Sequence, residues 1–333
     1  MKTAVLLLAA GRDNQMNDTR PKEMHKLLGR TLLEHVLDNT ADLVDETVIV
    51  TGAQLSPSEL PEGTKVTVQD YVPNSGALKA VLAGMALLSP DVERVLICAS
   101  DMPALSADSY RRLIEAVDGV HADAAVLYAD VENPEGLDRI IFGGDGDVKR
   151  IMSAKHVGPF EEDISSISVR VFCFTRKALE RAQAEMRFDG RNLTHLSRMV
   201  EILSGCGRTV AAVAIDDPRE AVRVVSQHDM TAAFRFMNER NCLRHMDAGV
   251  TIIDPANTYI ESAVRIGPDT VIFPGCFLQG RTVIGKGCRI RPHCRLKHTT
   301  VGDRAIIEQS VLIGDTVQPG EVIPPFTYHE KVD

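Results

Sequence analysis

The sequence predicts an α/β domain with a largely parallel, doubly wound sheet, followed by a shorter β-helix. Two patterns carry this prediction. Residues 2–230 alternate short apolar runs with helical patterns, which is typical of a parallel sheet covered by helices. From about residue 260 a six-residue period replaces that alternation, and such a period is typical of a β-helix. The length of 333 residues also favours two domains over one.

The strands of the first domain are predicted from short runs rich in Val, Ile, Leu and Ala, at residues 3–9, 46–51, 94–99, 124–129 and 209–215. Such runs fit strands that are buried on both faces. Helical patterns lie between them, for example at 75–88, 106–118 and 176–186. Ser106 and Thr175 are expected N-caps of two of these helices. In a doubly wound sheet ligands bind at the carboxyl ends of the strands, so the site is expected there.

A helix is predicted to connect the two domains, because residues 228–246 contain neither Gly nor Pro and place apolar residues at helical spacing. The predicted domains are therefore the α/β domain at 1–228, the connecting helix at 229–248, the β-helix at 249–322 and a tail at 323–333.

Two inward positions recur through the β-helix segment. Large aliphatic residues take the first position, with a slip of one residue after residue 296: Ile260, Ile266, Ile272, Leu278, Ile284, Ile290, Leu296, Val301, Ile307 and Ile313. The fourth residue after each of these is small or β-branched: Val264, Thr270, Cys276, Thr282, Cys288, Cys294, Thr300, Ala305, Val311 and Val317. Three hexads make one triangular coil, so this segment predicts just over three coils.

Three cysteines of this segment have two interpretations. Cys276, Cys288 and Cys294, with neighbouring His293, could form a metal cluster. However, all three fall at the compact inward position, where a free cysteine packs as a small apolar residue. We therefore predict core cysteines.

The composition excludes several classes of protein. No apolar run approaches the roughly 18 residues that a membrane span needs, and residues 1–10 fit a strand better than a signal peptide. The net charge of −9 argues against a nucleic-acid partner, because such binding requires Lys and Arg to neutralise phosphates. Seven cysteines without a Cys-x-x-Cys pair suit a reducing compartment. We expect a cytoplasmic protein that binds neither membranes nor nucleic acid.

One segment has the opposite charge. Residues 281–302 contain six basic residues and no acidic one: Arg281, Lys286, Arg289, Arg291, Arg295 and Lys297. They form either a solvated outer face, which could also pair with acidic neighbouring subunits, or an anion-binding belt around the β-helix.

The first predicted strand leads into a loop with the marks of a phosphate site. Residues 7–22 read LLAAGRDNQMNDTRPK. Backbone amides around Gly11 could hold phosphate oxygens. Pro21 and Lys22 supply a fixed turn and a cation at the other end of the loop.

Together these segments resemble one family along nearly the whole chain, the bacterial N-acetylglucosamine-1-phosphate uridyltransferases. Residues 7–22 match the family's Leu-Ala-Ala-Gly-x-Gly-Thr-Arg-Met…Pro-Lys, and residues 27–38 match the segment that follows it. Residues 248–275, AGVTIIDPANTYIESAVRIGPDTVIFPG, resemble the family's entry into its β-helix. The resemblance implies a Rossmann-like nucleotidyltransferase domain followed by a short left-handed parallel β-helix.

The family joins a nucleoside triphosphate to a sugar 1-phosphate and releases pyrophosphate, a reaction that depends on positioning and charge neutralisation. The resemblance implies Mg²⁺ as the cofactor, a nucleotide or nucleotide sugar and a sugar 1-phosphate as ligands, and a homotrimer built on the β-helix. Acetyltransferase activity is not expected, because the β-helix is shorter than in the bifunctional relatives.

The resemblance also assigns roles to residues. Lys22 matches the catalytic loop lysine, and Asp101 matches the aspartate that binds Mg²⁺. Gly136, in Gly-Leu-Asp-Arg-Ile, matches a residue of the sugar site. Nucleotide-binding positions match Leu8, Ala9, Ala10, Gly11, Gln69, Ser75 and Gly76, with Gln69 at the uracil edge.

The loop departs from the family pattern. Gly-Thr-Arg is replaced by Asp13-Asn14-Gln15, so the arginine that clamps the triphosphate is absent. Arg12 or Arg20 could take its place.

Other departures concern the metal and the ligands. The family's second metal ligand, an asparagine, aligns with Val225, although a gap could place Ser226 or Gln227 there. Asn74 replaces a glycine at the base site, and Ser153 and Ser168 fall about where a glutamate and an asparagine hold the sugar.

Two functions remain open at this point. The chain is either a sugar-1-phosphate nucleotidyltransferase that forms or binds a UDP-sugar with weak or altered activity, or a catalytically degenerate relative with a ligand-binding, regulatory or scaffolding role. The enzyme needs replacements for the missing arginine and metal ligand, whereas the binding protein needs neither.

Overall fold

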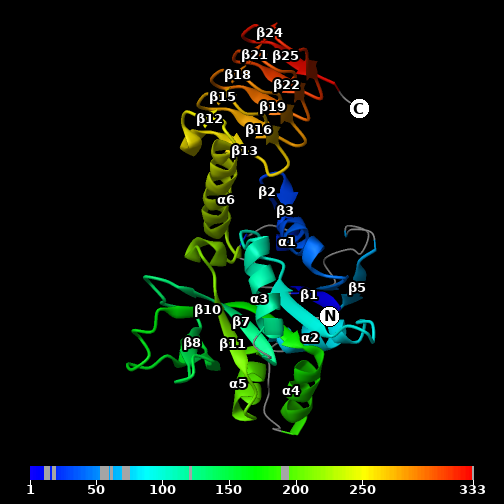
Figure 1. Cartoon of the computed structure of the whole chain (residues 1–333), viewed down its shortest axis with the longest axis vertical. Helices are drawn as coiled ribbons and strands as arrows, with labels where there is room; N and C mark the ends of the chain where they lie inside the picture. Colours follow the sequence, from blue (N-terminus) through cyan, green and yellow to red (C-terminus); the bar gives the residue numbers. More distant parts are fainter. Residues whose placement is uncertain are drawn as a thin grey trace. The chain divides into compact units, whose positions relative to one another are not determined.

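The computed structural model describes residues 1–10, 16, 20–52, 60, 63–69, 76–119, 122–188 and 195–331. These residues form two compact units (Figure 1). Unit 1 comprises Met1–His25 and Leu32–Gln227, and unit 2 comprises Lys26–Thr31 and His228–Asp333. The helices of the described ranges are all too short or too polar to cross a membrane.

Unit 1 is built on a nine-stranded sheet. Its main path runs β11 (Val210–Ala214), β7 (Ala124–Asp130), β10 (Ser166–Thr175), β6 (Arg94–Ala99), β1 (Thr3–Ala9), β4 (Glu46–Thr51) and β5 (Lys65–Val68). Strand β10 is antiparallel to both of its neighbours, while the other pairs along this path are parallel. A hairpin of β8 (Arg139–Phe142) and β9 (Val148–Met152) pairs with β10.

Helices cover both faces of this sheet. One core contains buried side chains of α2 (Gly76–Met85), α4 (Arg176–Phe188) and α5 (Ser197–Gly205). The other contains those of α1 (Leu32–Thr40) and α3 (Ala107–Gly119). The predicted doubly wound α/β domain is therefore confirmed.

Both predicted N-caps are present. The hydroxyl of Ser106 accepts a hydrogen bond from the amide of Ser109 at 3.2 Å, and that of Thr175 accepts one from the amide of Ala178 at 3.2 Å. Each cap satisfies an amide that has no partner inside its helix.

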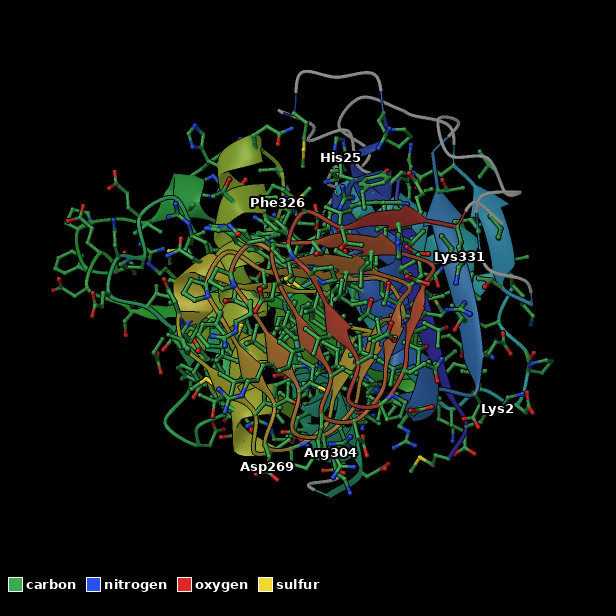
Figure 2. All side chains as sticks on the ribbon, turned by 90° about the horizontal axis from the view of Figure 1, so that it is seen from above. Lys2, His25, Asp269, Arg304, Phe326 and Lys331 are labelled. Carbon is green, nitrogen blue, oxygen red and sulfur yellow. The ribbon has the colours of Figure 1, made fainter. Side chains whose placement is uncertain are left out.

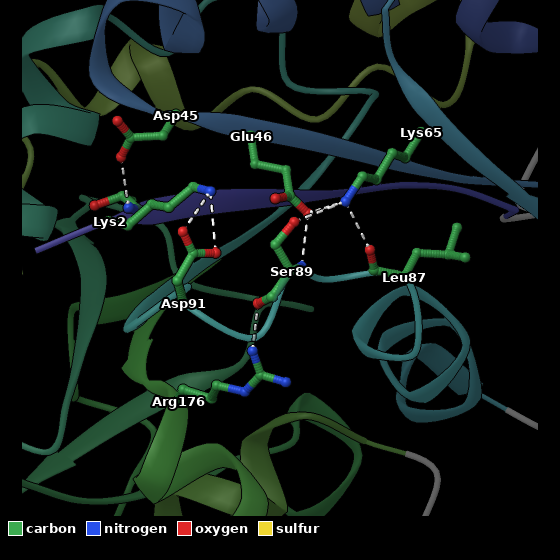
Figure 3. A network of polar contacts seen from close by, with 9 residues as sticks. Lys2, Asp45, Glu46, Lys65, Leu87, Ser89, Asp91 and Arg176 are labelled. Atoms are coloured by element: carbon green, nitrogen blue, oxygen red, sulfur yellow. Dashed lines mark hydrogen bonds and ion pairs between the residues drawn. The ribbon is translucent and has the colours of Figure 1, made fainter.

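The amino ends of the strands are tied together by polar contacts (Figure 3). Glu46 accepts hydrogen bonds from Lys65 at 2.8 Å and from the Ser89 amide at 3.1 Å. Arg176 donates to the Ser89 carbonyl at 2.7 Å, and Lys2 pairs with Asp91 at 3.0 Å. These contacts lie at the amino edge of the sheet, opposite the carboxyl edge where a ligand is expected.

Unit 2 combines α6 (Gln227–Asp247) with a β-helix of short parallel strands. The three β-helix sheets are β12-β15-β18-β21-β24, β13-β16-β19-β22-β25 and β14-β17-β20-β23 (Figure 1). Their bounds are β12 Thr251–Ile252, β13 Tyr259–Ile260, β14 Arg265–Ile266, β15 Val271–Ile272, β16 Phe277–Gln279, β17 Val283–Ile284, β18 Arg289–Ile290, β19 Arg295–Lys297, β20 Thr300–Val301, β21 Ile306–Ile307, β22 Val311–Ile313, β23 Thr316–Val317, β24 Val322–Ile323 and β25 Tyr328–Glu330. The hairpin of β2 (Lys26–Leu27) and β3 (Arg30–Thr31) also belongs to this unit.

Helix α6 covers the first coil of the β-helix. Asn238 donates to the Thr258 carbonyl at 2.8 Å and accepts from the Ile260 amide at 3.0 Å. Asn241 donates to the Ile260 carbonyl at 2.9 Å. These side-chain amides pair with a strand edge that would otherwise be open.

The predicted large aliphatic positions are correct up to Ile307 and the compact positions up to Cys294, and several later positions are wrong. Leu312 is fully buried and pairs with Leu296, whereas Ile313 is only half-buried. The compact positions shift as well: Thr299 and Ser310 are buried in place of Thr300 and Val311, and Val317 belongs to the large aliphatic series. The reason is that the later coils are shorter than the 18 residues of a regular coil.

The three inward cysteines are core residues, as predicted. Cys276, Cys288 and Cys294 are fully buried, and burial raises the pKa of the Cys288 thiol.

The corners of the coils need a left-handed backbone. At one corner Asp269, Gly287 and Arg304, which belong to successive coils, have φ angles of 61°, 65° and 59°. Asp269 and Arg304 are labelled at this corner in Figure 2, which is seen from above. Phe326, with φ of 65°, is at another corner. A left-handed backbone costs free energy for a residue other than glycine. Hydrogen bonds between successive coils stabilise it here. For example, the Arg304 amide donates to the Lys286 carbonyl at 2.8 Å.

Candidate active site

Four parallel strands end side by side at the carboxyl edge of the unit 1 sheet, in the order β6, β1, β4 and β5. Asp101 follows β6, Ala10 follows β1 and Gln69 follows β5. The Ser100 amide donates to the Leu8 carbonyl at 3.2 Å, and the Gln69 amide donates to the Thr51 carbonyl at 2.8 Å. Three strand spacings separate the ends of β6 and β5, a distance of about 14 Å.

A buried ion pair lies at the end of β6. Lys22 is in a short 3-10 helix, η1 (Lys22–Met24), and its Nζ lies 2.5 Å from Oδ2 of Asp101. The two side chains are 3% and 2% exposed. The structure therefore brings together the predicted catalytic lysine and the predicted metal ligand, which are 79 residues apart.

A second cation reaches the same oxygen. Nε of Arg223 donates to Oδ2 of Asp101 at 2.9 Å, and the Arg223 side chain is one-third exposed. The next residue, Val224, donates its amide to the Asp101 carbonyl at 2.8 Å. Sequence reasoning missed Arg223, because a single arginine in Ala-Val-Arg-Val-Val gives no sign of a partner 122 residues away.

The segment that carries Arg223 is anchored to α3. Glu220, in η5 (Pro218–Ala221), is 8% exposed and accepts from the Ser106 amide at 3.0 Å and from the hydroxyls of Ser106 and Ser109 at 2.9 Å each. These bonds fix the chain three residues before Arg223.

A carboxyl group next to Lys22 has an unusual environment. Glu23 is 4% exposed, and its Oε1 has no hydrogen-bond partner within the described ranges. Burial, with a smaller contribution from the charge of nearby Asp101, raises the pKa of Glu23 to about 7, although hydrogen bonds with its own backbone and with Ser100 and the charge of Lys22 oppose the rise.

The predicted sugar-site glycine lies in a turn that needs glycine. Gly136 has φ of 73°, and no atom lies within 4 Å of the place a Cβ would take. Arg139 is buried and donates to the carbonyls of Pro134 and Leu137, which holds the turn.

An ion pair lies beside this turn. Asp138 Oδ2 accepts from Arg170 at 2.7 Å and 3.1 Å, and Arg170 has φ of 60° within a bulge of β10. Ser168, the last residue of β10 that pairs with β7 before this bulge, accepts from the Arg170 amide at 3.2 Å. The β10–β6 ladder reaches Phe172 opposite Ile97, so the bulge lies near the carboxyl end of β6.

The remaining predicted positions divide into two groups. Leu8 and Ala9 end β1, Ala10 follows it and Gly76 begins α2. Gly11 and Ser75, together with Arg12, Asn74 and the loop residues 13–15, lie outside the described residues. Arg20 is described and exposed.

Comparisons with known proteins show which family models and relatives this chain matches. A family model described as a MobA-like NTP transferase domain matches residues 5–161, and a bacterial transferase hexapeptide model of six repeats matches residues 263–298. The bifunctional protein GlmU of Enterococcus faecalis (strain ATCC 700802 / V583) is 33% identical over 330 residues, covering 97% of this chain and 71% of the relative. The chain belongs to the GlmU family.

Another GlmU, from Geobacillus sp. (strain WCH70), is 31% identical over 98% of this chain and 72% of its own length. The resemblance inferred from the sequence is thereby confirmed. The GlmU match extends through both units, so the α/β domain and the β-helix belong to one family architecture.

Two solved structures share the fold. A CMP:2-keto-3-deoxy-manno-octonic acid synthetase complexed with CTP aligns with a TM-score of 0.52 at 14% identity, covering 72% of this chain and all of the other. A 2-C-methyl-D-erythritol 4-phosphate cytidylyltransferase from Thermus thermophilus aligns with a TM-score of 0.50 at 22% identity, covering 70% and 98%. At these identities the likeness concerns the nucleotidyltransferase fold alone.

Proposed function

We propose that the chain is a sugar-1-phosphate nucleotidyltransferase of the GlmU type, which binds UTP or a UDP-sugar at the carboxyl edge of unit 1 with weak or altered turnover. Membership of the GlmU family and the NTP transferase domain support the class of reaction. The observation that carries the proposal is the buried Lys22–Asp101 pair at the end of β6. A fixed cation there can neutralise phosphate charge at low reorganisation cost.

The order of the strand ends along the carboxyl edge supports one orientation of the bound nucleotide. Gln69, at the end of β5, would face the base, while Lys22 and Arg223 would face the phosphates. The sugar phosphate oxygen would then attack the α-phosphorus and pyrophosphate would leave, with little covalent chemistry required from the protein. Gly136 and the neighbouring turn would lie at the sugar.

Weak turnover is proposed because a charged group is missing from the loop. Gln15 stands where the family has its arginine clamp, and an arginine in such a position is worth roughly 10³–10⁵ in rate. A glutamine can donate hydrogen bonds but carries no charge. Asp13, close to it in sequence, adds an anion.

The second candidate function is a binding protein without turnover, with a regulatory or scaffolding role. Val225 favours it where the alignment without a gap holds, because an aliphatic side chain then takes the place of the family's asparagine metal ligand; a gap would place Ser226 or Gln227 there instead. This candidate predicts ligand binding with no pyrophosphate release.

The first experiment is a thermal-shift screen of the full chain with UTP, other nucleoside triphosphates, sugar 1-phosphates and nucleotide sugars. A ligand at 100 times its Kd stabilises the folded state by about 2.7 kcal/mol. We expect UTP or a UDP-sugar to raise the Tm, and a screen without any shift would contradict the proposal.

The second experiment measures pyrophosphate release with the ligands that bind. We expect release far below that of an ordinary enzyme, and recovery in the variant Asp13→Gly/Gln15→Arg/Val225→Asn. Fast release by the natural sequence that is abolished by Asp101→Ala would show that Arg12, Arg20 or another group has replaced the clamp. Ligand binding with no release, before and after the substitutions, would favour the second candidate.

We also propose a homotrimer that assembles through the β-helix and works in the cytoplasm. Exposed apolar side chains on the outer faces of the β-helix support self-association, since Phe277, Val283 and Tyr328 are 44%, 45% and 63% exposed. All seven cysteines are free thiols, which suits a reducing compartment.

A further inference from the structure

The resemblance to the family implies Mg²⁺ at Asp101, and the residues around Asp101 do not fit this ion. Oδ2 already accepts from Lys22 at 2.5 Å and from Arg223 at 2.9 Å. Oδ1 is buried without a hydrogen-bond partner in the described part of the chain, so one oxygen is left for a ligand. However, Mg²⁺ bound there at about 2.1 Å would lie close to two fixed positive charges, which would repel it.

The rest of the donor set is also unsuited to a metal. The Val224 amide donates to the Asp101 carbonyl, so the chain passes Asp101 at this residue. Val225, the next residue, has an aliphatic side chain with no atom that can ligate Mg²⁺.

We propose that Arg223 replaces the divalent metal of the relatives, so that nucleotide phosphates bind to Arg223 and Lys22 without Mg²⁺. This inference rests on the proposed function, because it requires a nucleotide at the carboxyl edge. Asp101 then has a different task from a metal ligand: its Oδ2 orients both cations toward the bound phosphates.

The geometry of Arg223 suits this role. Its side chain is one-third exposed while that of Asp101 is buried, so the side chain of Arg223 extends from the buried carboxylate toward the protein surface. A guanidinium is planar and always charged, and it can donate two parallel hydrogen bonds to phosphate oxygens. Glu220 acts as a positioning residue, since its three bonds to Ser106 and Ser109 hold the segment that leads to Arg223.

The test compares UTP binding to the full chain in Mg²⁺ and in EDTA by isothermal titration calorimetry. We expect the Kd of the natural protein to change by less than about threefold between the two buffers. For Arg223→Ala we expect a loss of about 10- to 100-fold in EDTA, the usual range for charge-assisted hydrogen bonds, with partial recovery in Mg²⁺ because Asp101 is then open to the ion. Arg223→Lys, which keeps the charge, should lose less than Arg223→Ala.

Arg219→Ala is the matched control. Arg219 lies in the same segment, pairs with Asp217 at 2.8 Å and is 55% exposed on its side chain, so its removal should leave the Kd unchanged in both buffers.

Direct metal binding gives a second readout that does not depend on any nucleotide. Electron paramagnetic resonance of Mn²⁺ should show no tight site in the natural protein, and a new site in Arg223→Ala/Val225→Asn. Binding of UTP to the natural protein only in Mg²⁺, or a tight Mn²⁺ site in the natural protein, would overturn the inference and leave the proposed function standing. No binding of any nucleotide in either buffer would instead overturn the proposed function and this inference with it.

Discussion

Arg170 has a backbone conformation that an arginine rarely adopts. Its φ of 60° lies in the left-handed region, where a side chain with a Cβ costs roughly 1–2 kcal/mol relative to the right-handed region. The bulge of β10 and the ion pair with Asp138 hold it there. Backbone strain of this kind is concentrated at functional sites in proteins, and Arg170 lies beside the turn that carries Gly136, the predicted sugar-site glycine.

Substitution at this residue separates the backbone cost from the ion pair. Arg170→Ala and Arg170→Gly both remove the pair with Asp138, which is partly solvent-exposed and contributes little. Only glycine relieves the left-handed strain, so we expect the glycine variant to be more stable than the alanine variant by about 1 kcal/mol. Urea unfolding of the two variants measures this difference, and equal stabilities would mean that the bulge relaxes on substitution.

The candidate site could be predicted from the sequence only in part, and the reason is visible at single residues. Lys22 and Asp101 are predictable because each follows a strand or a loop motif that fixes its place at the sheet edge. Arg223 is not predictable, because its partner is fixed by a tertiary contact that leaves no local pattern. Glu23 is missed for the same reason, since its burial and its interaction with the charge of Asp101 arise only in the folded chain.

Helices and strands also divide into those that the local sequence predicts and those that depend on tertiary contacts. Strands β1, β4 and β6 begin and end where the apolar runs do, since they are central and buried on both faces. The antiparallel direction of β10 depends on which neighbours it meets, and this information is not local. The hexad pattern identifies the β-helix, but it fails at Thr299 and again at Leu312, because a shortened turn has no signal in a six-residue period.

The end of the β-helix provides a prediction about pH. Asp315, just before β23, is 8% exposed. Burial by itself raises the pKa of this carboxyl group, but hydrogen bonds from Lys331 at 2.7 Å, from His329 at 2.9 Å and from the Thr316 amide outweigh it and lower the pKa to about 2.

A lowered pKa in the folded state stabilises the protein above the ordinary pKa of 3.8, and this stability is lost as the pH falls toward 2. The contribution is at most about 2 kcal/mol, and screening of the two exposed partners reduces it. We expect Asp315→Asn to be less stable than the natural chain at pH 5 and to approach it in stability near pH 2. Urea unfolding at both pH values tests this, with the exposed Asp269→Asn as the control. A difference that persists unchanged at pH 2 would contradict the assignment.

On the scale of the whole molecule, two different periodicities produce two different kinds of core. Unit 1 buries two apolar layers, one on each face of its sheet, whereas unit 2 buries a single column inside its coils. The column is closed to solvent and the amino end of the β-helix is covered by α6. The apolar side chains of the coils that remain exposed therefore lie on the outer faces of the β-helix.

These outer faces support the prediction of a homotrimer. Each of the three β-helix sheets presents exposed apolar residues to solvent, for example Val322, Phe277 and Val283, and a monomer gains nothing from leaving them uncovered. A closed rotational arrangement would bury them without forming an open filament.

Light scattering coupled to size exclusion should give three times the chain mass of 36.4 kDa at micromolar concentration. Val283→Glu places a charge on one outer face. If that face lies in the interface, the variant should have a lower assembly mass than the natural chain. Thr316→Glu, on the same sheet, serves as a comparison. A full-length chain that remains a monomer at micromolar concentration would show that the apolar residues of the coils serve another partner.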